Sequence, residues 1–143
     1  MLARWRYTGV YSSYNFSLSA SLWIAITQLL FQLLGTSLYY AVHDAAGDLV
    51  GMFSFYPRPG NIVEVGLGMR PDKTGQGKGL AFVRAGLDFA REEFKPASFQ
   101  LDVAVFNQRA RLVYERAGFA QTGTLTRRIK GRREEYIQMS RPA

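Results

Sequence analysis

The sequence predicts a single α/β (α+β) domain in which helices cover both faces of a mixed β-sheet. The chain has 143 residues, of which 48% are hydrophobic, and this suffices for one core within the usual size of a domain. Runs of alternating apolar residues are interspersed with runs in which apolar residues recur every three or four positions. We therefore expect residues 1–143 to form one domain, with elements in the order strand, helix, three strands, helix, strand, helix and two strands.

The first two elements are a strand at about residues 6–16 and a helix at about residues 19–34. An amphipathic stripe marks the helix: Leu22, Ile26, Leu29 and Leu33. The most apolar stretch, residues 22–34, is 13 residues long, whereas a membrane span needs roughly 20. We expect this helix to pack on the core and the protein to have no membrane partner; an interfacial helix or a homodimer contact is the alternative.

A hairpin and a further strand follow. Residues 38–43 and 49–56 read as strands around a polar turn, and Pro57, Pro59 and Gly60 are expected to end this hairpin. Residues 62–70 alternate, with Glu64, Gly66, Gly68 and Arg70 on one face. Glycines weaken a strand, so this face indicates a close approach of a backbone or a ligand.

The second half of the chain alternates helices with strands. A stripe from Leu80 to Phe94 predicts a helix that Pro96 stops. Residues 99–105 form a strand whose inward side chains should be Leu101, Val103 and Val105. Asn107 can cap a helix that runs to about Ala117 and ends at Gly118. Strands at about 119–125 and 134–140 should close the sheet as a hairpin.

Charge and composition limit the function classes. The net charge is +7 and five of the seven residues 127–133 are basic, which favours phosphate-bearing partners, either a small cofactor or nucleic acid. A solvated hairpin loop is the alternative explanation of the basic run, and no nucleic-acid recognition motif is present. The chain has no cysteine, which removes disulfides and thiol nucleophiles. With no signal-peptide pattern at Met1, we expect a cytoplasmic protein.

Metal chemistry is not expected. The sequence shows no cluster of His, Asp and Glu with metal-ligand spacing. His43 is the only histidine, and it stands beside a turn, far from the other chemical motifs. We therefore expect neither a metal site nor a catalytic role for His43.

Residues 74–79 read Thr-Gly-Gln-Gly-Lys-Gly between a strand and a helix. Such a turn leaves backbone N–H groups open at the positive end of a helix, where phosphate binds. A Walker loop fails because Gly79, not Ser or Thr, follows Lys78. The dinucleotide fingerprint fails because Leu80 stands where its third glycine is required.

This segment resembles the pyrophosphate-binding signature of the GNAT N-acetyltransferase superfamily, Arg/Gln-x-x-Gly-x-Gly/Ala. The preferred register is Thr74-x-x-Gly77-x-Gly79, in which Thr74 departs from Arg or Gln; a shift by two gives Gln76-x-x-Gly79-x-Ala81. Residues 101–119 are similar to the family's later strand, asparagine, helix and Tyr-Glu-x-x-Gly-Phe ending. The layout looks closest to the ribosomal-protein-alanine N-acetyltransferase branch, and it implies a mostly antiparallel sheet with a splayed central strand.

The resemblance also implies an acetyl-CoA-dependent N-acetyltransferase that transfers acetyl directly to a primary amine in a ternary complex. The backbone at the end of the central strand would pair with the pantetheine arm, the glycine-rich segment would surround the pyrophosphate, and an asparagine would contact the pantetheine. The implied cofactor-binding residues are Leu67, Gly68, Met69, Thr74, Gly75, Gln76, Gly77, Lys78, Gly79, Leu80 and Asn107.

Three side chains are candidates for catalysis. Tyr114 matches the family's general acid, although it could instead pack on the core. The amine must lose a proton before it attacks, and Glu64 and Asp102 are equal candidates for the base or for a rim that selects a cationic substrate. The acceptor is a small-molecule or peptide amine; the alternative readings are a CoA-binding protein without catalysis and a basic nucleic-acid-binding module.

Overall fold

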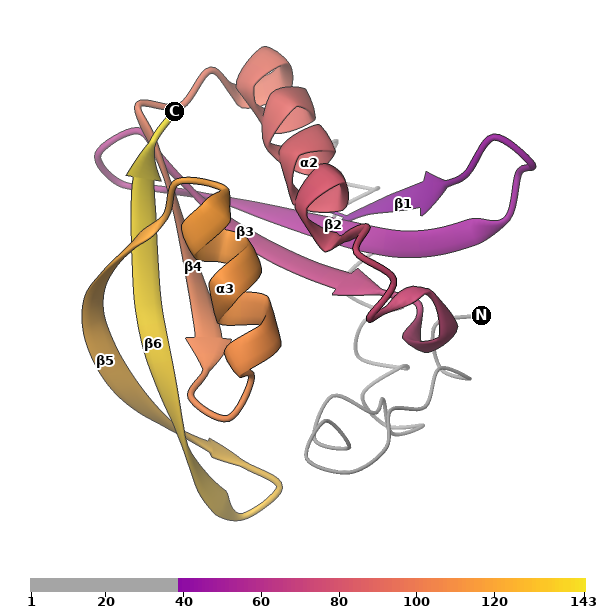
Figure 1. Ribbon diagram of the computed structural model, residues 1–143. Helices are drawn as coiled ribbons and strands as arrows, with labels where there is room; N and C mark the ends of the chain where they lie inside the picture. Colours follow the sequence, from indigo (N-terminus) through magenta and orange to yellow (C-terminus); the bar gives the residue numbers. More distant parts are fainter. Residues whose placement is uncertain (1–38) are drawn as a thin grey trace. The chain divides into compact units, whose positions relative to one another are not determined.

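The computed structural model describes residues 39–143, so the strand and helix expected before Tyr39 lie outside the described residues. The elements, drawn in Figure 1, are β1 (Tyr39–His43), β2 (Leu49–Arg58), β3 (Ile62–Met69), the 3₁₀ turn η3 (Pro71–Lys73), α2 (Gly79–Phe94), β4 (Ser98–Ala104), α3 (Gln108–Arg116), β5 (Ala120–Ile129) and β6 (Arg132–Pro142). The strand order is β1-β2-β3-β4-β6-β5. β3 and β4 are parallel, and the pairs β1–β2, β4–β6 and β5–β6 are antiparallel. This confirms the predicted mixed, mostly antiparallel sheet.

The described chain divides into two compact units, residues 39–54 with 67–74 and residues 55–66 with 75–143. In the first unit, β1 and the start of β2 form the expected hairpin. Asp44 closes its turn, because Oδ1 accepts hydrogen bonds from the amides of Ala46 and Asp48, both at 3.0 Å. The Arg70 amide donates to the Val50 carbonyl at 2.7 Å, which ties the segment after β3 to this hairpin.

β2 ends within the expected segment of Pro57, Pro59 and Gly60, since its last residue is Arg58. Pro57 is exposed at the end of the strand, where a missing N–H costs the sheet nothing. The reversal is made by Gly60 and Asn61, whose φ angles are 85° and 56°.

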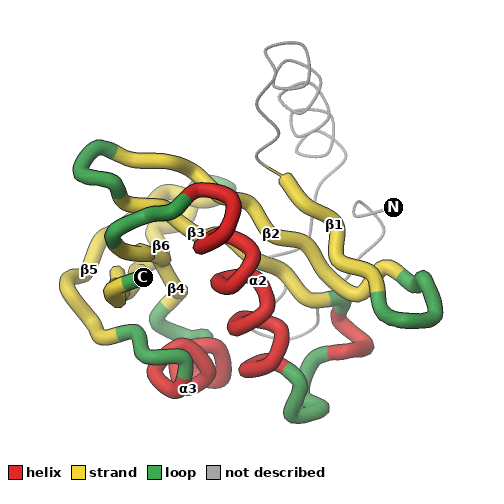
Figure 2. Tube along the Cα trace, turned by 90° about the horizontal axis from the view of Figure 1, so that it is seen from above, coloured by secondary structure: helices red, strands yellow, loops and turns green. Residues whose placement is uncertain are grey.

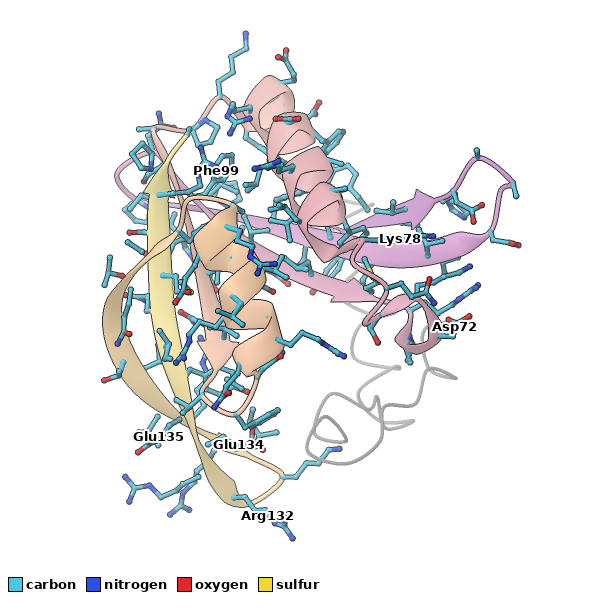
Figure 3. All side chains as sticks on the ribbon, viewed as in Figure 1. Asp72, Lys78, Phe99, Arg132, Glu134 and Glu135 are labelled. Atoms are coloured by element: carbon cyan, nitrogen blue, oxygen red, sulfur yellow. The ribbon has the colours of Figure 1, made fainter. Side chains whose placement is uncertain are left out.

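The core of the second unit lies between the strands and α2. Phe99, Leu101 and Val103 of β4 are buried, as are Val83, Leu87 and Ala90 of α2. Figure 3 shows Phe99 between β4 and α2, where the Arg91 guanidinium lies 5.8 Å from its ring centroid. Within this unit α2 and α3 lie on the same face of the strands (Figure 2). The helix expected for the other face belongs to residues outside the described part.

The ends of both helices follow the sequence signals. α2 ends at Phe94, and its C-cap, Lys95, has a left-handed conformation directly before Pro96. Asn107 caps α3 through Oδ1, which accepts from the Ala110 amide at 3.1 Å. Gly118, with a φ of 93°, ends the helix as expected.

The expected inward position of Val105 was wrong. β4 ends at Ala104, and the side chain of Val105 is 40% exposed. The Asn107 amide donates to the Ala104 carbonyl at 2.9 Å. The chain therefore already turns toward the α3 cap at Val105 and leaves the alternation of the strand.

The basic run 127–133 is not the hairpin loop that the sequence suggested. β5 continues to Ile129 and β6 begins at Arg132, so only Lys130 and Gly131 form the turn. Their φ angles of 50° and 78° are those of a two-residue turn that matches the twist of the strands. The flanking basic side chains therefore alternate between the two faces of the hairpin.

The central strand is splayed as the resemblance implied. β3 pairs with β4 only from Ile62 to Glu64, opposite Ser98 to Gln100. β4 nevertheless continues to Ala104. Among residues 39–143, no helix is both long enough and apolar enough to cross a membrane.

Candidate functional site

The glycine-rich turn, Thr74–Gly79, leads into α2. Gly75 and Gly77 have φ angles of 71° and 73°, a conformation that glycine adopts without strain. A Cβ placed on Gly77 would meet no heavy atom within 4 Å, so the turn is open there. α2 has no side-chain hydrogen bond at its N-cap, Lys78. No N-cap side chain therefore accepts from the N–H groups of its first turn, which is the end of a helix where anions bind.

α3 packs against this turn through two residues that are one helical turn apart. A Cβ on Gly79 would lie 3.4 Å and 3.7 Å from the two methyl carbons of Val113, and one on Gly75 would lie 3.6 Å from Nη1 of Arg109. Gly79 therefore allows α3 to approach closely. Sequence reasoning missed Arg109; its position four residues before Val113 was the available signal.

The two helices that meet at the turn both begin with positive charge. Lys78 is the N-cap of α2, where Figure 3 labels it, and neither α2 nor α3 has an acidic residue in its first turn. Arg109 is the second residue of α3. A cation at the positive end of a helix costs about 0.3–1 kcal/mol. The arrangement therefore favours an anion, and it fits the pyrophosphate that the resemblance assigned to this turn.

The segment that leads to the turn belongs to the first unit. Leu67, Gly68 and Met69 form the end of β3. The Thr74 hydroxyl donates to the Pro71 carbonyl at 2.7 Å and so closes η3. The departure from Arg or Gln at this position thus has a local structural role.

An ion pair stabilises the start of η3. Nε and Nη2 of Arg70 donate to the two carboxylate oxygens of Asp72 at 2.6 Å and 3.1 Å. The hydrogen bond from Arg70 lowers the pKa of Asp72 below its ordinary value of 3.8. The same bond raises the pKa of Arg70.

Asn107 and Tyr114 both belong to the α3 region, as expected. Asn107 lies directly after the end of β4 and caps the helix; this cap is compatible with a contact to pantetheine. Tyr114 is buried, and its ring meets Phe119 edge-on, with centroids 6.2 Å apart. The packed ring fixes the direction of α3 and of the tyrosine.

The carboxylate face consists of Glu64 and Asp102 with their arginine partners, Arg58 and Arg127. Glu64 lies opposite Gln100 in the register. Because side chains alternate along a strand, Glu64, Gln100 and Asp102 project from the same face of the sheet. The structure therefore brings the two candidate bases together.

Each carboxylate is already paired. Arg58 Nε donates to Glu64 Oε2 at 2.7 Å, and Arg127 Nη2 pairs with Asp102 Oδ2. The Arg127 guanidinium reaches Asp102 across β6, 5.0 Å from the ring centroid of Tyr136. The Asp102 side chain is only 7% exposed, and its Oδ1 is buried without a hydrogen-bond partner in the described part of the chain. Sequence reasoning missed both arginines.

Tyr114 and the carboxylate face belong to different sides of β4. Leu101 and Val103 share a face of β4 with Phe99, whose ring lies near Arg91 of α2, so Asp102 projects from the opposite face. Tyr114, the candidate proton donor, and the two candidate bases therefore do not form one side-chain cluster. Within residues 39–143, no group of three or more His, Cys, Asp or Glu side chains could hold a metal ion.

Comparison with known proteins adds an independent result. A family model described as the acetyltransferase (GNAT) family matches residues 4–119. No protein of curated function matches the sequence.

Solved structures show the same fold. Spermidine N-acetyltransferase from Vibrio cholerae in complex with CoA and spermine has a TM-score of 0.72 and 21% identity, with 89% of this chain and 76% of that chain covered. A dodecameric form of the V. cholerae enzyme has a TM-score of 0.71 and 22% identity, with 83% of this chain and 73% of that chain covered. A protein provisionally described as a phosphinothricin N-acetyltransferase has a TM-score of 0.65 and 20% identity, with 79% of this chain and 74% of that chain covered.

Proposed function

The chain belongs to the GNAT acetyltransferase family, and from this premise we propose that it transfers an acetyl group from acetyl-CoA to a primary amine in a direct ternary complex. Acetyl-CoA is the acetyl donor of the family. The observation that carries the proposal is the glycine-rich turn, whose Gly75 and Gly77 are left-handed and whose helix begins without a side-chain cap. Such a turn offers backbone donors to a pyrophosphate.

The donor site is assigned residue by residue. The backbone of Gly75, Gln76, Gly77, Lys78, Gly79 and Leu80 would hold the pyrophosphate, and Thr74 would shape the turn. Leu67, Gly68 and Met69 would pair with the pantetheine arm, and Asn107 would contact it. When bound, acetyl-CoA supplies an acetyl group activated as a thioester.

The reaction asks for one proton acceptor and one proton donor. The acceptor amine must be neutral before it forms the new C–N bond, and Glu64 or Asp102 would take its proton, directly or through water. The C–S bond then breaks, and the Tyr114 phenol would protonate the departing sulfur. A backbone N–H near Leu67–Met69 would polarise the carbonyl.

The acceptor class follows from the charges on the carboxylate face. Arg58 and Arg127 neutralise Glu64 and Asp102, so these pairs offer no surplus negative charge to a polycation. We infer that the acceptor is a small-molecule or peptide amine of low positive charge. A peptide beginning with alanine represents the ribosomal-protein-alanine branch among the candidates.

Ligand-induced stabilisation tests the proposal. Acetyl-CoA and CoA should raise the melting temperature and ATP should not, because binding to the folded state at 100 times Kd adds about 2.7 kcal/mol. Absence of stabilisation by either CoA species up to millimolar concentration would contradict the proposal.

A thiol-release assay then tests catalysis and the acceptor. Spermidine, lysine, an alanine-initiated peptide and simple monoamines should be compared at equal concentration. We expect turnover with monoamines or the peptide to exceed turnover with spermidine. CoA binding without thiol release from any amine would favour the non-catalytic reading, and steeply salt-dependent RNA or DNA binding without CoA binding would favour the nucleic-acid module.

A further inference from the structure

Arg109 is the side chain that α3 brings to the glycine-rich turn. Its Nη1 lies 3.6 Å from the position that a Cβ on Gly75 would occupy. One turn further along α3, Val113 lies against Gly79 at the start of α2. Because both residues lie on the same side of α3, the packing of Val113 also brings Arg109 to the turn.

The placement of Arg109 is unfavourable for α3 on its own. It is the second residue of the helix, and no acidic residue occupies the first turn. A positive charge there opposes the helix dipole. Lys78 repeats the pattern at the N-cap of α2. An anion beside these two helix starts would lower the electrostatic cost of both cations.

The glycine-rich turn itself lacks a charged side chain at the first position of its motif. Thr74 occupies that position, and its hydroxyl already donates to the Pro71 carbonyl. A guanidinium binds phosphate oxygens through two parallel N–H donors. Arg109 is exposed, so its fork can be reached by a ligand.

We propose that Arg109 is a ligand for the pyrophosphate of the acyl donor and supplies, from α3, the positive charge that Thr74 does not. This rests on the proposed function, because it assigns a residue to the donor site of that reaction. The neighbouring backbone N–H groups give the turn its shape complementarity, and Arg109 adds the charge-assisted hydrogen bonds.

Calorimetric binding of CoA and of dephospho-CoA to the full chain tests the assignment. Arg109→Met should weaken both ligands by the same factor, about tenfold for one charge-assisted hydrogen bond. Arg109→Lys should recover part of the loss, because it keeps the charge but not the fork. Arg116→Met is the matched control: the same helix loses the same charge in its last turn, and affinity should stay unchanged.

The melting temperature of the unliganded variants separates binding from structure. Arg109→Met should melt at or above the wild-type temperature, because it removes a cation from the start of α3. A lower melting temperature, or an unchanged CoA affinity, would overturn the proposal. A loss confined to CoA would also overturn it, because the arginine would then recognise the 3′-phosphate. Failure of the proposed function looks different: wild type itself would bind neither ligand.

Discussion

The glycine-rich turn and the carboxylate face are built in different ways. The turn is six consecutive residues, of which Gly75 and Gly77 have a left-handed backbone. The carboxylate face is assembled from side chains on four strands, with Arg58 on β2 paired to Glu64 on β3 and Arg127 on β5 paired to Asp102 on β4. The proposed contacts of the turn with a ligand come from its backbone. The charges of the carboxylate face are neutralised by arginines that are distant in the sequence.

This difference explains why one region was easier to predict than the other. A turn that depends on glycine spacing is visible in a short stretch of sequence. An ion pair across 25 residues, such as that of Arg127 with Asp102, is visible only once the strands are in register. The comparison therefore predicts that changes in the turn affect donor binding, whereas changes in the face affect stability and turnover.

The largest expected effect comes from Tyr114→Phe. If the Tyr114 phenol protonates the departing sulfur, loss of its hydroxyl should lower kcat by about 100-fold. CoA affinity should stay within about twofold, because the ring that packs on Phe119 is retained. Steady-state kinetics with calorimetry measures both. Unchanged turnover would remove Tyr114 from the acid role and leave the fold assignment intact.

The next effect tests the turn alone. Gly77→Ala places a Cβ in the space assigned to the pyrophosphate and should weaken CoA binding by on the order of 30-fold. Gly131→Ala is the matched control, since Gly131 has a φ of 78° and a Cβ there would also meet nothing within 4 Å. Both variants should lose about 1–2 kcal/mol of stability from the left-handed backbone. Equal CoA affinity in the two variants would contradict the donor site.

A smaller effect concerns the carboxylate face. Arg127→Met should destabilise the fold by about 1–2 kcal/mol, because it leaves the buried Asp102 carboxylate without its partner. The loss is smaller than for a fully buried pair, because the arginine is partly exposed to solvent. Arg58→Met, in the more exposed pair, should cost under about 1 kcal/mol. Urea unfolding measures both values. A larger loss of unfolding free energy for Arg58→Met than for Arg127→Met would contradict this ranking of the two ion pairs.

The smallest effect concerns the Arg70–Asp72 ion pair, which precedes the glycine-rich turn. The pKa of Asp72 is lowered in the folded state, so the Arg70–Asp72 pair stabilises the protein at neutral pH. That contribution is lost as the pH falls through the lowered pKa. Asp72→Asn should therefore melt slightly below wild type at pH 7, and the difference should disappear in acid. Melting curves across pH test this; a difference that grows in acid would have the wrong sign.

The order of described elements and the α3 cap at Asn107 were predictable from periodicity and residue type. The failures had local physical causes. Val105 continues an apolar alternation, but the turn into Asn107 overrides it. The basic run resembles a loop, yet Lys130 and Gly131 suffice for the reversal. The roles of Glu64, Asp102 and Tyr114 remain predictions, because the sequence gives their type and spacing but not what binds beside them.

Because β3 pairs with β4 over only a short stretch, part of β4 is an unpaired strand edge within the described chain, although it is a central strand. Beyond Gln100, β4 runs to Ala104 with β6 on its other side, and no described strand pairs with it toward β3. An open edge elsewhere would invite another chain to add a strand. We expect an extended small molecule to take that place here. Amide hydrogens along this edge should exchange rapidly in the free protein and slowly once such a molecule completes the sheet.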